Sequence, residues 1–200
     1  MVEMPVNNKD EELDQLRQYI ENSAVASQLK SSATQLVFGS GNTDADVVFV
    51  GEAPGKQEDI TGEPFVGASG KFLNEMLASI GVQRSDVYIT NIVKYRPPDN
   101  RDPTKPEKQA FWPHLLSQIA IIRPKIVVTL GRHPGEAFLP ELIISKHHGQ
   151  PTQIKVELGG REETITVLPL YHPAAALYNG KLRQTLLDDF QSIPKILADN

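Results

Sequence analysis

The residues that could do chemistry in this chain gather in short segments rich in glycine, proline and alanine. In Gly51-Glu52-Ala53-Pro54-Gly55, glycines allow a ligand to approach the backbone closely and Glu52 supplies a carboxylate. Asn91 ends a short apolar run, and its side-chain amide is both a hydrogen-bond donor and an acceptor. His172 precedes a proline, which biases it towards a loop, and three alanines follow. Each feature alone also has a plain structural explanation: a turn, a cap and a structural histidine.

Two further features could bind a ligand or a metal. The loop Thr61-Gly-Glu-Pro-Phe65-Val-Gly67 holds an aromatic ring among glycine and proline; such a ring usually belongs to a core, but the loop favours exposure. His147 and His148 suggest a metal, yet no spaced carboxylate or third histidine accompanies them, so we expect no metal site. GxGxxG and the Walker lysine are both absent, which leaves a nucleotide-processing enzyme without a phosphate-binding motif.

The elements that must position these residues alternate between strands and helices. Apolar, β-branched runs predict strands at 46–50, 87–91, 125–130 and 164–168. Helical spacing predicts helices at 10–30, 69–80 (capped by Ser69), 104–122 (with Pro113 as a kink or a restart) and 181–197. This order indicates the α/β class: one three-layer α/β/α domain over 1–200, with a mainly parallel four-stranded sheet and an N-terminal helical segment at 1–30.

Parallel strands bring separate segments together. Ligands of such sheets bind beyond the carboxyl ends of the strands. The 51–55 loop, Asn91 with the loop after it, and 170–177 all follow predicted strands. We therefore expect these three segments to form one site.

Composition limits the classes of function. The chain has 200 residues, 40% hydrophobic and 22% charged, which is ordinary for a globular protein. It has no apolar run long enough for a membrane span and no signal-peptide pattern, so we expect a cytoplasmic protein. The formal charge of −5 weakly disfavours a DNA partner, because phosphates attract basic surfaces. However, five acidic residues crowd the N-terminal segment (Asp10, Glu11, Glu12, Asp14 and Glu21), whereas Lys94, Arg96 and Arg101 cluster in mid-chain.

Four longer segments together resemble the family 4 uracil-DNA glycosylases. They are 47–77 (VVFVGEAPGKQEDITGEPFVGASGKFLNEML), 86–103 (DVYITNIVKYRPPDNRDP), 125–140 (KIVVTLGRHPGEAFLP) and 168–186 (LPLYHPAAALYNGKLRQTL). The resemblance implies the uracil-DNA glycosylase fold and an enzyme that flips uracil out of DNA and hydrolyses its N-glycosidic bond in base excision repair. The alternative is a catalytically weak or inactive DNA-binding protein of the same fold.

The resemblance also implies roles for three base-binding residues. Phe65 would stack on the extruded uracil, and Asn91 would bond its N3–H and O4, excluding cytosine. His172 would donate to uracil O2, where negative charge grows as the bond breaks. Gly51, Ala53 and Gly55 would complete the base pocket.

The group that activates water is less defined by the resemblance. Glu52 would orient or activate water, or exclude the methyl group of thymine. Ala53 stands where better-known relatives carry a catalytic aspartate, and an alanine side chain cannot activate water. Glu58 and Asp59 are weaker candidates than Glu52 for water activation.

Contacts with DNA are expected in two regions. The loop formed by Ala174, Ala175, Ala176 and Leu177 would press into the duplex, with Leu177 as a wedge for the gap that flipping leaves. The phosphate contacts would come from Lys94, Arg96, Arg101 and Arg183.

The family usually holds a [4Fe–4S] cluster on four cysteines, and this chain has none. The corresponding positions align with Ala24, Ser27, Tyr95 and Trp112, of which none can be a thiolate ligand. We therefore expect a cluster-free protein in which Tyr95 and Trp112 fill the vacated volume as a hydrophobic plug. The expected partner is uracil-containing DNA of the nucleoid, bound by a monomer without a cofactor.

Overall fold

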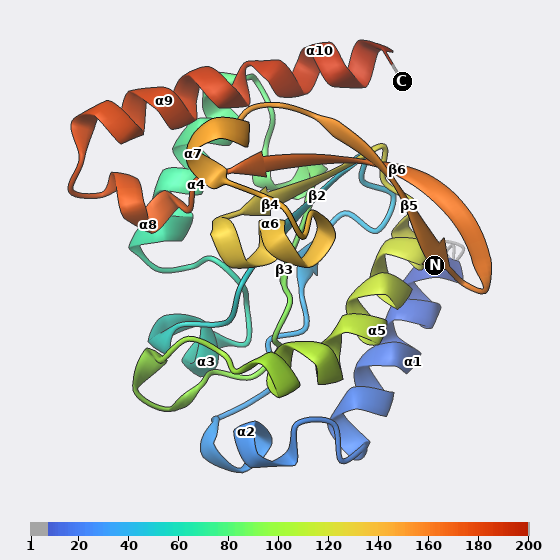
Figure 1. Cartoon of the computed structure of the whole chain (residues 1–200). Helices are drawn as coiled ribbons and strands as arrows, with labels where there is room; N and C mark the ends of the chain where they lie inside the picture. Colours follow the sequence, from blue (N-terminus) through green and yellow to red (C-terminus); the bar gives the residue numbers. More distant parts are fainter. Residues whose placement is uncertain (1–7, 200) are drawn as a thin grey trace, which may run out of the picture.

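The computed structural model describes residues 8–199, so the first seven positions of the predicted 1–30 helical segment lie outside the described residues. The strands are β1 (Ser40–Gly41), β2 (Val47–Gly51), β3 (Tyr88–Asn91), β4 (Ile126–Leu130), β5 (Thr152–Leu158) and β6 (Arg161–Leu170). They form one sheet in the order β1-β3-β2-β4-β6-β5 (Figure 1). The four predicted strands are its parallel centre, β3-β2-β4-β6.

The predicted number of four strands is wrong, because an antiparallel strand is added at each edge of the sheet. β1 has only two residues, too few for a pattern. Along β5 the exposure alternates at Ile154, Val156 and Leu158, with Lys155 and Glu157 between them turned to solvent. Such a half-exposed edge strand lacks the continuous apolar run that marks a buried parallel strand.

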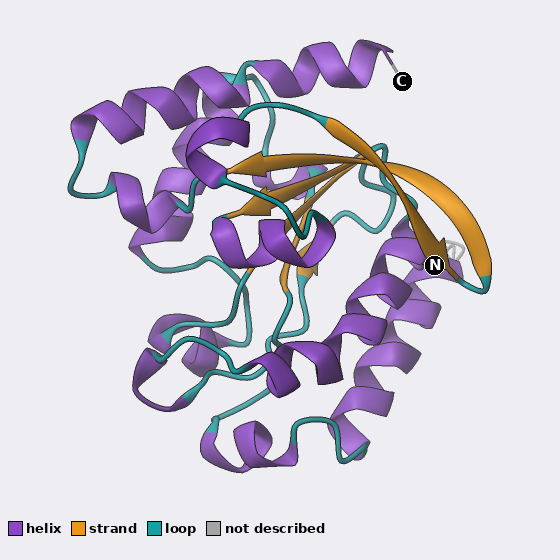
Figure 2. Cartoon of the chain, viewed as in Figure 1, coloured by secondary structure: helices purple, strands orange, loops and turns teal. Residues whose placement is uncertain are grey.

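Helices cover both faces of the sheet (Figure 2). They are α1 (Asn8–Asn22), α2 (Ser27–Ser32), α3 (Lys56–Thr61), α4 (Ala68–Ser79), α5 (Lys105–Ile122), α6 (Arg132–Phe138), α7 (Ile144–His147), α8 (Pro173–Ala176), α9 (Gly180–Phe190) and α10 (Ser192–Asp199), with 3-10 turns at Arg84–Asp86 and Pro98–Asn100. Gly67, not Ser69, caps α4, and the predicted last helix is divided into α9 and α10. Pro113 lies inside α5, so the helix does not restart there. No helix within 8–199 has the length and apolarity to cross a membrane.

Two apolar layers result from the alternation of side chains along β2. Val48 and Val50 pack into a cluster with α1, α5 and Phe138 of α6. Val47 and Phe49 point the other way, into a cluster with α4, α9 and α10. Because side chains alternate between the faces of a strand, Gly51 and Glu52 at its carboxyl end also face opposite layers. This division separates the two halves of the site.

Candidate active site

The carboxyl ends of β2 and β3 meet side by side, since Gly51 is the register partner of Asn91. A Cβ added to Gly51 would lie 2.3 Å from Asn91 Oδ1 and 2.7 Å from Phe65 Cε2. A larger residue would therefore displace the amide or the ring, and glycine is needed for this close approach. The His172 ring stacks on Phe65 with ring centroids 5.8 Å apart. The structure thus brings Gly51, Phe65, Asn91 and His172 together.

The backbone conformation of the loop, fixed by contacts with distant side chains, determines where the Phe65 ring lies. Phe65 adopts a left-handed conformation, with φ of 51°, which a bulky residue rarely adopts unless the surroundings impose it. Glu58 Oε1 accepts hydrogen bonds from the backbone N–H groups of Val66 and Gly67, both at 3.0 Å. Arg84 donates to the carbonyl of Phe65 at 3.1 Å and also to that of Pro64. Sequence reasoning missed Arg84, because a helical-turn arginine 19 residues away carries no local signal.

These contacts change the interpretation of the two weaker water activators. Glu58 ties down the loop after Phe65. Asp59 is buried and accepts from the Thr34 N–H and hydroxyl, both at 2.9 Å. Carboxylates committed to such bonds are structural, so neither Glu58 nor Asp59 is available to activate water.

His172 is a neutral donor in this arrangement. It caps α8, and its Nδ1 accepts the Ala174 N–H at 3.0 Å, so the neutral ring carries its proton on Nε2. Burial lowers the pKa of His172 to about 4. At neutral pH the ring therefore offers one N–H, at Nε2, to a ligand beside Phe65.

Asn91 is 2% exposed, and within residues 8–199 no group bonds its side-chain amide. Its backbone carbonyl is held by Lys94, whose Nζ donates to it at 2.7 Å, to Thr90 Oγ1 at 2.6 Å and to Gln118 Oε1. Lys94 is fully buried, and burial lowers its pKa well below the usual value. The prediction that Lys94 contacts DNA phosphate is therefore wrong: three buried oxygens, one of them on α5, draw it inwards to brace Asn91.

Glu52 points to the other layer, towards α5 and α6. Its Oε1 lies 3.8 Å from Lys108 Nζ and 3.8 Å from His133 Nε2, while His133 Nε2 is 3.6 Å from Asp102. Within residues 8–199 this buried Oε1 has no hydrogen-bond partner. Burial, and next the negative charge of Asp102, raise the pKa of Glu52 to about 7. Glu52 is thus a carboxyl group able to exchange a proton near neutral pH.

His133 was missed in the sequence, although a signal was present. It lies two residues after Gly131, beyond the carboxyl end of β4. The other three parallel strands, β2, β3 and β6, end at the segments that were expected to form the site, so the end of β4 belonged with them. Ala53 packs against the cluster that contains α5, and Gly55 caps α3. Ligand atoms of Glu52, Asp102 and His133 lie within 4.8 Å of one another, but Lys108 competes for the same carboxylate.

The loop after β6 differs from the expected wedge. Ala174 and Ala175 are exposed, but Ala176 is 2% exposed and Leu177 packs partly into the core. The exposed large side chain here is Tyr178, at 97%. Leu177 is therefore poorly placed to enter a duplex, and the next residue projects instead.

The three predicted arginines lie at or near the surface with local partners. Arg96 Nε donates to Asn100 Oδ1 at 2.7 Å, and Arg101 forms a bidentate pair with Glu107 at 2.9 and 2.6 Å. Arg183 pairs with Glu75 and lies 4.1 Å above the Phe72 ring. The paired histidines are also engaged: His147 Nδ1 accepts from Ile143 N–H, and His148 pairs with Asp189 at 2.7 Å.

The four positions expected to replace cluster cysteines differ in burial. Ala24 and Ser27 are exposed, lining a small hollow beside the start of α5. Tyr95 is 2% exposed and meets the buried Phe111 ring edge-on, with centroids 6.0 Å apart. Trp112 meets the Phe138 ring edge-on and packs, partly buried, against the same apolar cluster as Tyr95, so the plug stays a prediction. These methyl, hydroxyl, phenol and indole groups do not fit an iron–sulfur cluster, and the chain has no cysteine.

Comparison with known proteins shows the family of the chain. The family model of the uracil DNA glycosylase superfamily matches residues 38–192. A type-4 uracil-DNA glycosylase of Archaeoglobus fulgidus is 46% identical over 173 residues, covering 84% of this chain and 85% of the relative. Those of Sulfurisphaera tokodaii (47% identical, 82% of this chain, 75% of the relative) and Thermotoga maritima (45%, 82% and 83%) are similarly close. The chain therefore belongs to the uracil DNA glycosylase superfamily, as its sequence motifs indicated.

Proposed function

We propose that the protein is a monofunctional uracil-DNA glycosylase that binds flipped uracil between Phe65, Asn91 and His172. The observation that carries this proposal is the close approach of Gly51 to the Asn91 amide and the Phe65 ring. The neutral His172 ring, stacked on Phe65, completes the pocket. The type-4 relatives are named as enzymes of this activity. The DNA would be that of the nucleoid in the cytoplasm.

The base pocket would recognise uracil by hydrogen-bond pattern. The Asn91 carbonyl would accept from uracil N3–H and its NH₂ group would donate to O4, whereas cytosine presents the reverse pattern. The place of the Asn91 amide, beside the Gly51 backbone and the Phe65 ring and without a hydrogen-bond partner within residues 8–199, supports this assignment. Phe65 would supply a rigid stacking surface.

Cleavage would rely on stabilising the leaving group. As the bond between N1 of uracil and C1′ of the sugar breaks, its electron pair passes to the base, and negative charge develops on O2. His172 Nε2–H would donate to this oxygen without a change in its own protonation. A water oxygen would form the new bond to C1′, and its proton would pass to the Glu52 carboxylate. The uracil anion then takes a proton from solvent.

Contact with DNA would involve the surface around the α8 loop and the exposed arginines. Tyr178, rather than Leu177, is the side chain available to fill the gap in the base stack. Arg96, Arg101 and Arg183 remain phosphate contacts in this proposal. A single copy contributes every group named here, so we propose a monomer that needs no cofactor.

The direct test is release of uracil from a labelled oligonucleotide, detected as alkali-sensitive abasic sites. Strands with one uracil should be cut, whereas matched strands with thymine or cytosine at that position should not. The Asn91→Ala, His172→Ala double variant is the matched inactive control. Binding of the uracil strand without abasic sites would contradict the proposal and favour the inactive DNA-binding protein.

A further inference from the structure

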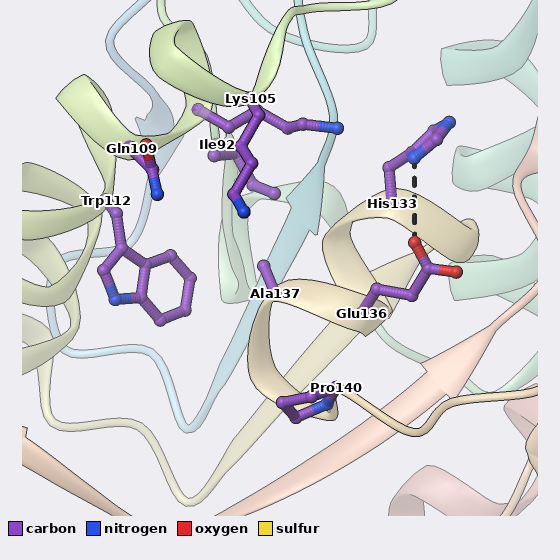
Figure 3. Close-up of a pocket in the computed structure, with 9 residues that line it drawn as sticks. Ile92, Lys105, Gln109, Trp112, His133, Glu136, Ala137 and Pro140 are labelled. Carbon is purple, nitrogen blue, oxygen red and sulfur yellow. Dashed lines mark ion pairs between the residues drawn. The ribbon is translucent and has the colours of Figure 1, made fainter.

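A groove of about 560 Å³ lies between α5 and α6, on the Glu52 side of the site. Its α5 wall is made by Lys105, Lys108, Gln109 and Trp112. These residues are spaced i, i+3, i+4 and i+7, so they form one stripe along the helix. Figure 3 shows the Trp112 ring and Gln109 facing Ala137 and Pro140 across the groove.

The stripe changes in character along the helix. Its first turn carries two lysines, at the end where α5 begins and its backbone N–H groups give partial positive charge. Within residues 8–199 no carboxylate pairs with Lys105, and Lys108 has only the 3.8 Å contact with Glu52. On the α6 wall, Glu136 lies 3.7 Å from Arg132, which offsets its charge. The lysine end is therefore suited to an anion such as phosphate.

The other end of the stripe is aromatic. Trp112 meets the Phe138 ring edge-on at a centroid distance of 4.9 Å, which fixes the orientation of the indole. Its residue is only partly buried, and the groove floor beside it is apolar, with Ile92 and Ala137. Gln109 adds an amide between the indole and the lysines. The Trp112 indole can stack on the face of a base, and the Gln109 amide can hydrogen-bond the edge of that base. The lysine amines, further along the same row, can pair with the phosphate of the nucleotide.

The groove adjoins Glu52, at the carboxyl end of β2. Lys108 and His133 line it, and both lie 3.8 Å from Glu52 Oε1. Glu52 follows Gly51, whose backbone contacts Phe65 and Asn91. In our proposal, a strand that places a base beside Phe65 would lay a neighbouring nucleotide in this groove.

We propose that the groove binds an unpaired nucleotide of the strand that carries the uracil, with its base against Trp112 and its phosphate beside Lys105 and Lys108. The inference rests on the proposed function for its DNA strand. Because a paired base cannot stack on Trp112, the groove favours single-stranded over duplex substrates.

Trp112 is the only tryptophan in the chain, so its fluorescence reports on this groove directly. Titration with a single-stranded oligonucleotide that contains no uracil should quench the emission. The matched duplex should quench it weakly, and a base-free strand of the same length should not. Equal emission with all three ligands would overturn the inference.

Kinetics supply the second test. Trp112→Ala should raise KM for a single-stranded uracil substrate about tenfold, the effect of losing one base–aromatic stack, and leave kcat within about twofold. Trp112→Phe should recover part of the loss, and the exposed Lys105→Glu should raise KM without disturbing packing. Tyr19→Ala, which removes an exposed aromatic ring of α1, is the matched control and should change nothing.

The outcomes separate this inference from the proposed function. Unchanged KM in folded Trp112→Ala and Lys105→Glu variants, with normal uracil release, overturns the groove but not the glycosylase. Quenching by single strands without uracil release by the wild type supports the groove and contradicts the glycosylase.

Discussion

Gly51 and Glu52 are neighbours in the sequence, yet they face surroundings of opposite character. On the Gly51 side, Asn91 is 2% exposed, Phe65 is 7% exposed, and His172 is neutral because burial lowers its pKa to about 4. On the Glu52 side, burial raises the pKa of the carboxyl group to about 7, and its neighbours Lys108 and His133 lie at 3.8 Å, beyond hydrogen-bond distance.

This difference suggests a division of labour across the end of β2. The base side has a fixed shape and no charge that changes near neutral pH, as a pocket that discriminates between bases requires. The groove side holds groups that titrate and that have loose partners, which suits proton transfer and contact with a mobile strand. Substitutions on the two sides should therefore differ in the size of their effect on activity and in the pH dependence of that effect.

The largest effect is expected from His172→Ala. Removing a donor aimed at developing negative charge should lower kcat by about 10²–10³-fold, with little change in affinity for uracil-containing DNA. Single-turnover excision and a separate binding titration measure the two quantities. A variant that binds poorly but cuts at the normal rate when saturated would place His172 in DNA positioning instead.

Glu52→Gln should follow, with a loss of about 10²-fold in kcat at pH 8. The pKa of about 7 means that the ionised, proton-accepting form grows as pH rises through 7. Wild-type kcat should therefore rise between pH 6 and 8, and the variant should lose this rise. His172 cannot cause it, since its pKa of about 4 lies below the range. A flat wild-type profile would show that Glu52 does not accept the proton.

Asn91→Asp should have a smaller effect on rate and a larger one on specificity. It replaces the donor for uracil O4 with an acceptor, a mismatch of about 1–3 kcal/mol, or roughly 5–150-fold in uracil release. The new carboxylate can accept from the cytosine amine, so weak cytosine excision should appear. Acidic pH should partly restore uracil release by protonating the carboxyl. Unchanged uracil release without cytosine release at any pH would contradict base recognition by Asn91.

Local patterns predicted the centre of this fold and the residues of the base side. Each parallel strand is a nearly continuous apolar run, and the loops that follow β2, β3 and β6 pointed to Gly51, Asn91 and His172. Phe65 lies between α3 and α4, and the family resemblance implied its role. What could not be predicted depends on partners distant in sequence. Lys94 is in a segment with Arg96 and has the composition of a DNA contact, but Gln118, 24 residues later, helps to bury it.

The orientation of side chains on α5 was also beyond the sequence. Adjacent residues on a helix point about 100° apart. Phe111 therefore enters the core beside Tyr95 whereas Trp112 faces the groove, a distinction that the shared apolar character of the two residues conceals.

The smallest effect is expected from Tyr178→Ala. This substitution should weaken the binding of duplex DNA, whereas loss of Trp112 in the groove should weaken the binding of single strands. Tyr178 is 97% exposed directly after Leu177, so it is free to enter the gap that a flipped base leaves in a duplex. Such a gap exists only in paired DNA, because a single strand has no continuous stack to fill. The variant should raise KM for a duplex uracil substrate about fivefold, near the lower limit for a base–aromatic contact, and leave the single-stranded KM unchanged.

Tyr19→Ala, another exposed tyrosine, is the matched control. Trp112→Ala should show the reverse preference, so measuring both variants on both substrates tests the two sides together. Equal KM increases for single and double strands in Tyr178→Ala would mean that Tyr178 contacts the strand itself rather than the gap.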